Sequence, residues 1–519
     1  MKGESGLAAH WPIIVVVLLG TALRFYGLGA QNLWLDEALS WQQAVLPIAE
    51  LMQSVAADVH PPLYALTLHA ITGVFGDSEW MLRILSAICG AASIWLTWLV
   101  CRRLAGERTA LIASLLCAVS LFNIQYAQEA RMYTLMGCLA LLSMLFLLQI
   151  TAAALDDNAA TRTSRPARAL LFGYVLATGL LIYTHVYGLF IVLAQNLFMA
   201  LRYLPRWPDQ PTLPWLGWIK LQILLGVLFA PWVLVLVAQI NRVQTSFWLH
   251  KPYFNALRET FLAYMGAMPA LQLAMLAALA GLAVLMLPAS GKRRLQRLQT
   301  GDHKAAVSDA NPGALSSYST GLLLVLWLLT PILLPYLISQ FGQSIYLPRY
   351  TIASSFAWFM LVAIGIDNLP VGWLRYGFLA LLTLIMAGAL PFYYANSSRT
   401  DWPAAVAYLE GSADPAALVF FHSPEILAPY RYYQTRDELA LRTVVAAGGE
   451  SNGGENRAGG PDVRPVAQEY QHIWLISGYD YKTAITEPEI VGQLAESHEI
   501  LGGQEFGAIR VFQFMRPLQ

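Results

Sequence analysis

About eleven long apolar segments constrain this chain more than any other feature. They begin near residues 11, 80, 108, 132, 168, 187, 215, 267, 319, 350 and 374, and each has roughly the 17 to 25 residues that cross a bilayer as a helix. Hydrophobic residues make up 57% of the chain, charged residues make up 12%, and the mean hydropathy is +0.51. Because soluble proteins carry about twice that charged fraction, we predict a mainly α-helical, polytopic membrane protein of about eleven transmembrane helices.

Net charge and cysteine content exclude several other classes. The formal net charge is zero and the pI is about 7.1, so the chain has no basic field of the kind that binds nucleic acid. Cys89, Cys101, Cys117 and Cys138 lie in or beside apolar segments without CxxC spacing, which argues against a disulfide framework or a zinc site. The first segment resembles a secretory signal, but many apolar segments follow it, so we interpret it as a retained first span.

Basic residues predict the orientation in the membrane. They gather in alternate connections: Arg102, Arg103 and Arg108; Arg162, Arg165 and Arg168; Arg202 and Arg206; and Lys292, Arg293, Arg294, Arg297 and Lys304. The positive-inside rule places these connections and the amino terminus in the cytoplasm. We therefore expect a multi-pass protein of the plasma (inner) membrane. Its first extracytoplasmic loop is large, about residues 29–79, with an interfacial helix at Pro62–Phe75, which is too short to span.

The character of the sequence changes near residue 395. We predict a transmembrane domain over 1–394 and a soluble extracytoplasmic α/β domain over 395–519. In the latter, Ala417–Phe421 and Ile473–Ile476 are short and apolar, Pro403–Glu410 and Ile490–Glu496 have helical periodicity, and Ala446–Asp462 has the composition of a mobile loop.

An acidic pair follows the first apolar segment, in Leu33-Trp34-Leu35-Asp36-Glu37. Carboxylates at a membrane edge are candidates for a general base. On a helix neighbouring side chains diverge by about 100°, so only one would face a site. We choose Asp36 as the base and leave Glu37 as a metal ligand, an orienting group or a structural residue. The alternative is that the pair ends the first span and caps a following helix.

Histidines occur at two predicted outer turns. His60 precedes Pro61, which keeps it out of helical geometry at a helix start, and Tyr64 follows one turn later. A rigid imidazole there could bind a divalent ion, a phosphate or a sugar; alternatively it only ends a loop. His185, between two tyrosines at the end of a span, has the features of a packed interfacial residue.

Two arginines are expected on the outer face, against the prevailing charge bias. Arg131 lies in Glu129-Ala130-Arg131-Met132-Tyr133 and Arg349 lies in Pro348-Arg349-Tyr350. Arginine at a membrane edge suits a phosphate, and Glu129 could hold a metal or neutralise Arg131. The alternatives are a structural Glu129–Arg131 ion pair and an Arg349 side chain that extends to the interface.

One chemistry links these residues. A polyprenyl-phosphate sugar donor has an apolar tail, an interfacial phosphate and a projecting sugar. Arg131 or Arg349, with or without a metal, would stabilise the leaving phosphate, and a single displacement with Asp36 as base would invert the anomeric carbon. The alternative is a transporter or flippase of lipid-linked or small solutes. Transporters place functional polar residues near the midplane, whereas these cluster at one edge. A transferase of whole lipid-linked glycans also remains open.

As a set, these motifs resemble the GT-C class of integral membrane glycosyltransferases, particularly the protein O-mannosyltransferase and aminoarabinose-transferase-like group. The resemblance spans about residues 11–394. It implies a hexosyl- or pentosyltransferase with a polyprenyl-phosphate sugar donor, a protein, glycan or lipid acceptor, and no nucleotide cofactor. It also implies Asp36 as base and often a divalent metal (Mg, Mn, Ca or Zn), with Glu37, Glu129 and His60 as possible ligands. The expected phosphate or substrate contacts are His60, Tyr64, Arg131, Tyr133, Arg349 and Tyr350.

Overall fold

The computed structural model describes most of the chain: residues 5–155, 165–203, 215–246, 249–287, 315–396, 399–443, 462–478 and 486–517. These residues form two compact units. The first unit comprises Met1–Leu28, Pro47–Ile71 and Met81–Ala395, and the second comprises Gly29–Leu46, Thr72–Trp80 and Asn396–Gln519. Two segments of the predicted first loop therefore group with the carboxyl-terminal region.

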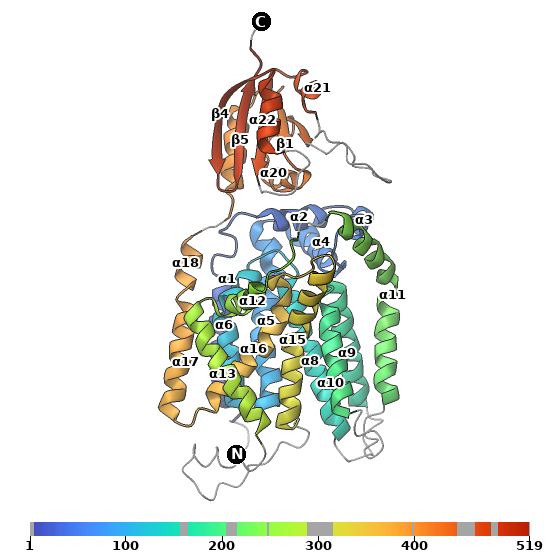
Figure 1. The fold of residues 1–519 in the computed structure, drawn as a ribbon, viewed down its shortest axis with the longest axis vertical. Helices are drawn as coiled ribbons and strands as arrows, with labels where there is room; N and C mark the ends of the chain where they lie inside the picture. Colours follow the sequence, from blue (N-terminus) through green and yellow to red (C-terminus); the bar gives the residue numbers. More distant parts are fainter. Residues whose placement is uncertain are drawn as a thin grey trace, which may run out of the picture. The chain divides into compact units, whose positions relative to one another are not determined.

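The first unit is a helical bundle (Figure 1). Its helices are α1 (Ser5–Phe25), α3 (Ile48–Ala57), α4 (Leu63–Phe75), α5 (Glu79–Ala105), α6 (Glu107–Val119), α7 (Leu121–Ala127), α8 (Tyr133–Leu155), α9 (Arg165–Thr184), α10 (Gly188–Tyr203), α11 (Trp215–Ser246), α12 (Asn255–Met265), α13 (Met268–Met286), α15 (Ser317–Phe341), the 3-10 helix η3 (Pro348–Thr351), α16 (Ile352–Asp367), α17 (Gly372–Ala387) and α18 (Leu390–Ala395). Every predicted apolar segment coincides with a helix, and the expected short helix is α4.

Several of these helices have the length and composition of membrane spans. Among the described residues seven qualify, and an eighth does so if α6 and α7, bent by 59° to each other, form one broken span. The prediction of a mainly α-helical, multi-pass membrane protein is confirmed, while the count of eleven spans stays a prediction.

Helix α16 forms the centre of the bundle. All its residues from Ile352 to Ile366 are buried, and it packs against α6, α8, α13 and α15. Glycines allow α13 and α16 to approach closely, since a Cβ atom on Gly365 would lie 1.8 Å from the carbonyl oxygen of Ala277. Small residues at such contacts are typical of helix packing in membranes.

The break between α6 and α7 is stabilised by a buried arginine. The Arg24 guanidinium donates hydrogen bonds to the carbonyl oxygens of Cys117 and Ala118, both at 3.1 Å. These oxygens lie in the last turn of α6, where intrahelical donors are missing because the chain bends at Ser120. The broken helix positions the turn that follows α7, which contributes to the candidate site below.

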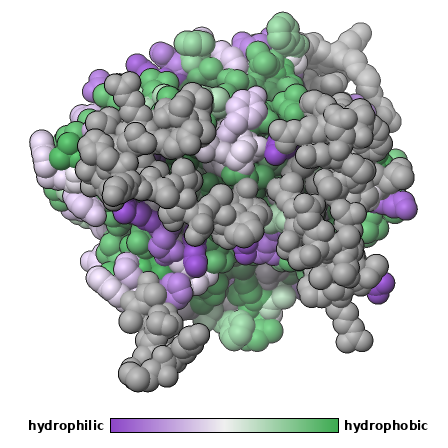
Figure 2. Space-filling model, turned by 90° about the horizontal axis from the view of Figure 1, so that it is seen from below, coloured by the Kyte–Doolittle hydropathy of each residue, from purple (hydrophilic) through white to green (hydrophobic). Residues whose placement is uncertain are grey.

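Hydrophilic side chains show among hydrophobic ones on the face of the molecule in Figure 2. The described part of the predicted cytoplasmic charge includes Arg102 and Arg103, both exposed in the last turn of α5. Arg108 and Arg375 pair with Asp367 at 3.5 Å and 3.8 Å, which ties α6 and α17 to the end of α16. Other predicted cytoplasmic residues, among them Arg162, Arg206 and Lys292–Lys304, lie outside the described residues.

The second unit contains a five-stranded sheet of order β2-β1-β3-β5-β4. Its strands are β1 (Leu418–Phe421), β2 (Ala440–Thr443), β3 (His472–Gly478), β4 (Glu499–Phe506) and β5 (Ile509–Met515). Strands β2, β1 and β3 are parallel, whereas β5 pairs antiparallel with both β3 and β4.

Helices cover both faces of this sheet (Figure 1). Helices α19 (Trp402–Ser412) and α20 (Leu427–Tyr433) pack on one face, and α21 (Arg464–Ala467) and α22 (Glu487–Ala495) pack on the other. A small 3-10 helix, η4 (Pro424–Ile426), precedes α20. The predicted strands and helices of the α/β region are present, and the predicted loop Ala446–Asp462 lies outside the described residues except for its last residue.

The first-loop segments of this unit are held by the carboxyl-terminal region. Helix α2 (Leu35–Ala44) packs against α20, and the Leu33 backbone N–H donates to the Tyr433 hydroxyl at 2.8 Å. Asn32 also donates to Asp401 at 3.2 Å. The acidic pair is thus built into the second unit.

Candidate active site

Four segments of the first unit converge on one site. They are the turn before α4, the turn between α7 and α8, the turn between α9 and α10, and the start of η3. Each lies where an apolar helix begins or ends, because polar side chains are tolerated there and not along the spans. The residues that they bring together are His60, Arg131, Tyr133, His185, Tyr187, Arg349 and Tyr350.

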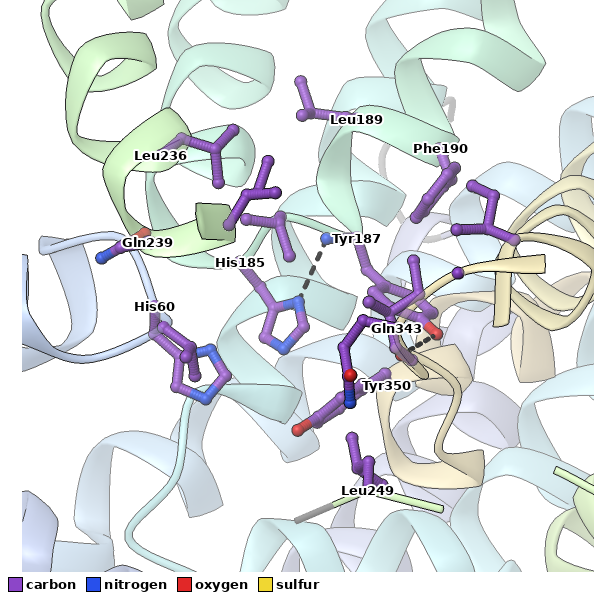
Figure 3. A pocket seen from close by; sticks show the side chains of 16 residues that line it. His60, His185, Tyr187, Leu189, Phe190, Leu236, Gln239, Leu249, Gln343 and Tyr350 are labelled. Carbon is purple, nitrogen blue, oxygen red and sulfur yellow. Dashed lines mark hydrogen bonds between the residues drawn. The ribbon is translucent and has the colours of Figure 1, made fainter. Parts of the chain in front are cut away.

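Two histidines and a tyrosine form the centre of this site (Figure 3). The imidazole centroids of His60 and His185 are 5.0 Å apart. The Tyr350 ring lies 4.8 Å from His185 and 6.3 Å from His60. Only 8% of His60 and 1% of His185 is exposed, so both imidazoles are removed from bulk water.

Two guanidinium groups flank the same aromatic ring. The Cζ atoms of Arg131 and Arg349 lie 5.9 Å and 6.0 Å from the centroid of Tyr133, and Arg349 is also 5.9 Å from the ring of Tyr350. Arg131 Nη2 lies 3.4 Å from His60 Nε2. Aromatic faces favour such cations, and two positive charges at one site attract an anion.

Local sequence explains these positions. Pro61 and Pro62 set the entry into α4, and Pro348 begins η3, because proline suits the first turn of a helix. Ser86 Oγ donates to the carbonyl oxygen of Arg131 at 3.0 Å, which fixes the turn after α7 to α5. The Tyr187 hydroxyl donates to the carbonyl oxygen of Ile345 at 2.8 Å and so joins the His185 turn to the approach of η3.

Burial and positive charge keep both imidazoles neutral. Burial lowers the pKa of His60 well below its usual value, and the charges of Arg131 and Arg349 lower it further. Burial is also the main cause of the low pKa of His185, followed by His60 and the same two arginines. An imidazolium would add charge to a desolvated cationic site, and both causes oppose it.

An apolar cavity of about 480 Å³ opens beside the two imidazoles (Figure 3). Its polar lining groups are His60, His185, Tyr187, Gln239, Gln343 and Tyr350, and its apolar wall includes Leu189, Phe190, Leu236, Ile240, Leu249 and Ile338. Pockets of this size that combine an apolar wall with a few polar groups are typical ligand sites. The combination suits a ligand with a charged head and a hydrocarbon tail.

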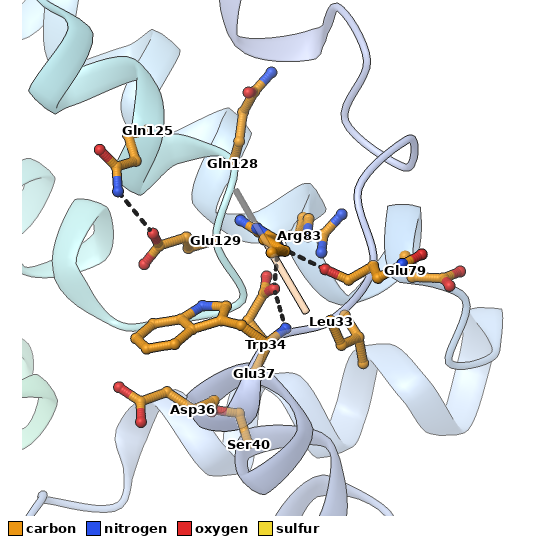
Figure 4. Close-up of polar contacts among 12 residues, drawn as sticks. Leu33, Trp34, Asp36, Glu37, Ser40, Glu79, Arg83, Gln125, Gln128 and Glu129 are labelled. Atoms are coloured by element: carbon orange, nitrogen blue, oxygen red, sulfur yellow. Dashed lines mark hydrogen bonds and ion pairs between the residues drawn. The ribbon is translucent and has the colours of Figure 1, made fainter. Parts of the chain in front are cut away.

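The acidic pair belongs to α2 in the second unit. Figure 4 shows that Asp36 and Glu37 point in different directions, as adjacent residues of a helix must. Glu37 is fully buried, accepts from the Trp34 backbone N–H at 3.4 Å and forms an ion pair with Arg399. These contacts suit the structural role, one of the three that the sequence leaves open for Glu37. Asp36 is only half-buried and stays the predicted base.

The remaining predicted residues lie in the first unit. Glu129 is buried and accepts from Gln125 Nε2 at 3.4 Å (Figure 4). Tyr64 is buried in the first turn of α4. In the described ranges no three His, Cys, Asp or Glu side chains are gathered as a metal would require, and the metal set of Glu37, Glu129 and His60 stays a prediction.

Sequence reasoning undervalued His185 and did not single out Tyr187 as a contact. Both lie in a predicted outer turn, as Arg131 and Arg349 do, and this shared location was the available signal. In the sequence, a lone histidine between tyrosines nevertheless indicates a packed interfacial residue. Only the fold shows that His60 and Tyr350 lie beside it.

One protein-family model matches part of the chain. A model of the dolichyl-phosphate-mannose-protein mannosyltransferase family matches residues 59–234, which include His60, Arg131 and His185. No curated protein matches the chain significantly.

Solved structures show the fold. ArnT from Cupriavidus metallidurans bound to undecaprenyl phosphate is 13% identical, with a TM-score of 0.58 over 97% of this chain and 98% of that one. The oligosaccharyltransferase AglB from Archaeoglobus fulgidus, in complex with an inhibitory peptide and a dolichol-phosphate, is 11% identical, with a TM-score of 0.54 over 91% and 70%. The structure of the Archaeoglobus fulgidus oligosaccharyltransferase in complex with Zn and sulfate is 11% identical, with a TM-score of 0.50, and the match covers 89% of this chain and 67% of that one. The chain has the fold of GT-C glycosyltransferases, and the resemblance predicted from its motifs is confirmed.

Proposed function

We propose that this protein transfers a sugar from a polyprenyl-phosphate donor to an acceptor hydroxyl on the extracytoplasmic face of the plasma (inner) membrane. The observation that carries the proposal is the grouping of Arg131 and Arg349 around Tyr133, with Arg131 in contact with His60, one of two imidazoles that line an apolar cavity. The cationic end suits the donor's phosphate, and the apolar wall suits the first isoprene units of its tail. The family match and the lipid phosphates bound by ArnT and AglB support the same donor class.

The proposed reaction is a single displacement. The acceptor oxygen attacks the anomeric carbon while Asp36 takes its proton, and the bond from that carbon to the phosphate oxygen breaks with its electron pair on the phosphate. The phosphate thereby gains one negative charge, which Arg131 and Arg349 stabilise. Attack from the opposite side inverts the anomeric carbon.

A donor screen tests this function. Purified full-length protein is incubated with labelled polyprenyl-phosphate sugars and a cell-envelope extract as acceptor. We expect transfer from at least one donor, lowered about 10²- to 10⁴-fold by Asp36→Asn, which is the usual contribution of a general base. Glu50→Gln, which changes an exposed carboxylate on helix α3, should retain full transfer.

Two outcomes would contradict the proposal. Undiminished transfer by Asp36→Asn would remove Asp36 from the base role. Movement of an intact lipid-linked sugar across vesicles, with transfer to none of the acceptors, would favour the transporter or flippase alternative. Cysteine labelling supplies a separate check, because residues 36 and 349 must both react from the extracytoplasmic side.

A further inference from the structure

Each buried histidine of the site has one ring nitrogen whose role is fixed by a neighbour. A guanidinium can only donate, so His60 Nε2, at 3.4 Å from Arg131 Nη2, is an acceptor. The backbone N–H of Tyr187 donates to His185 Nδ1 at 3.1 Å. A neutral imidazole carries one proton, which must therefore reside on His60 Nδ1 and on His185 Nε2.

These two N–H groups are buried donors that lack a protein acceptor. Neither His60 Nδ1 nor His185 Nε2 has a hydrogen-bond partner among the described residues, although both imidazoles line the cavity. Buried polar groups are nearly always paired. Two unmatched donors on neighbouring rings therefore indicate a ligand that supplies acceptor atoms.

The surrounding charges favour the neutral form of both rings. Arg131 reaches them from the turn after α7, Arg349 from η3, and the tyrosines of η3 and of the α9–α10 turn add no positive charge. Burial and these two guanidinium groups lower the pKa of each histidine. Neutral rings with fixed tautomers are the state that the hydrogen bonds above require.

This donor set does not fit a divalent metal. A metal ion binds an imidazole through a nitrogen lone pair. The lone pair of His60 is directed to Arg131, and that of His185 accepts from Tyr187. A cation would also face both guanidinium groups without a third clustered ligand among the described residues. An anion meets none of these objections, since the two unmatched imidazole N–H groups are donors and both guanidinium groups are cations.

We propose that His60 and His185 bind the donor phosphate as neutral N–H donors, together with Arg131 and Arg349, so that no metal bridges protein and phosphate. This inference rests on the proposed function, because it takes the phosphate of that donor as the anion. The two guanidinium groups attract the charge of the departing phosphate monoester. The imidazoles add hydrogen bonds without adding charge, which limits retention of the spent lipid.

The first experiment measures phosphate binding by full-length protein in detergent micelles. The probe is a short prenyl methyl phosphodiester, which carries one negative charge and has no sugar. His185→Leu removes the Nε2 donor, and we expect about 10- to 100-fold weaker binding, as for loss of one hydrogen bond to a charged group. His185→Gln places an amide N–H near the same position and should restore binding to within a few-fold.

Controls separate this inference from the proposed function. Arg349→Ala should lose binding in either case. If Arg349→Ala and His185→Leu both bind normally, the lipid phosphate lies elsewhere and the proposed function loses its main support. If only His185→Leu binds normally, the histidine inference alone is wrong. Inorganic phosphate at the same concentration should bind far more weakly than the probe, because it lacks the tail; equal binding would indicate a free-anion site.

A spectroscopic and a metal experiment test the imidazole chemistry directly. In protein labelled with ¹⁵N-histidine, the His185 signal, assigned by its absence in His185→Gln, should show a protonated Nε2 and an unprotonated Nδ1 and should shift when the probe binds. The reverse tautomer, or a signal unchanged by saturating probe, contradicts the inference. EDTA should leave probe binding unaltered; loss that Zn²⁺ or Mn²⁺ restores would overturn it.

Discussion

At the scale of single residues, burial and neighbouring charges decide which protonation state and which partners each side chain of the site has. His185 cannot easily take a second proton, because its ring is desolvated and faces two guanidinium groups. Glu37 accepts from a backbone N–H and pairs with Arg399 in the second unit. Asp36, one residue earlier, faces another direction and is half-buried. The two neighbouring carboxylates, Asp36 and Glu37, therefore have different surroundings, and the surroundings decide the properties of each.

The low pKa of His185 predicts a pH dependence of stability. In the unfolded chain the imidazole titrates near its ordinary value of about 6.5, so below that pH the unfolded state binds a proton that the folded state does not. The free energy of unfolding should then fall as pH decreases below about 6.5, by up to about 1.4 kcal/mol per pH unit for this one group.

Unfolding midpoints in detergent between pH 7.5 and 5 measure this effect. His185→Gln removes one of two such groups and should make the slope shallower, with the pKa of His60 still lowered by burial, whereas His250→Gln, which changes an exposed histidine, should keep the parent slope. A slope that is equally steep in His185→Gln would show that other groups cause it.

At the scale of elements, the site depends on how closely helices pack beneath it. Helix α16 continues directly from η3, which carries Arg349 and Tyr350. Its contact with α13 is set by Gly365 and Gly281, because a Cβ on Gly281 would lie 2.5 Å from the carbonyl oxygen of Leu361. The contact therefore fixes the base from which η3 projects.

Gly365→Ala should destabilise the bundle. Its new methyl group cannot fit at 1.8 Å from a backbone oxygen of α13, so the helices must separate, at a cost of about 1–3 kcal/mol or more. Gly226→Ala on α11 is the matched control, because a Cβ there meets nothing within 4 Å and alanine favours a helix by about 1 kcal/mol. Thermal unfolding should show a lowered midpoint for Gly365→Ala and an unchanged or raised one for Gly226→Ala; equal midpoints would contradict the packing argument.

At the scale of the whole molecule, segments distant in sequence are combined within each unit. Glu37 and Arg399 are 362 residues apart, yet they form a buried ion pair with side-chain exposures of 0% and 9%. The first-loop helix α2 is in this way part of the carboxyl-terminal unit. We infer that the second unit folds only with its first-loop segments present.

Removal of one partner should therefore destabilise the second unit. Arg399→Met removes a guanidinium group that pairs with the buried Glu37 carboxylate, at a cost of about 3–5 kcal/mol, and Glu37→Met removes the carboxylate from the same pair. The double variant should lose less than the sum of both. Asp462→Asn, in the half-exposed pair with Arg464, should leave stability nearly unchanged, because exposed ion pairs contribute little. Chemical denaturation of the full-length protein, followed by tryptophan fluorescence, measures all four, and additive losses would exclude coupling.

The apolar pattern was sufficient to predict the helices, since length and composition decide which segments enter a bilayer. It also identified the turns that carry Arg131 and Arg349, because polar residues are confined to helix ends. The metal set of Glu37, Glu129 and His60 stays a prediction, since ligation needs side chains to meet and the sequence does not encode distances. The His185 contact was missed for the same reason.

By itself, then, the sequence determined a helical membrane protein, a small α/β region and the polar turns at the ends of apolar segments, because hydrophobicity and periodicity are local properties. Only the tertiary structure decided that His60 and His185 lie 5.0 Å apart, that Glu37 pairs with Arg399, and which imidazole nitrogens keep their protons. These outcomes depend on packing between segments that the chain order separates, and burial and neighbouring charge act only after that packing is complete.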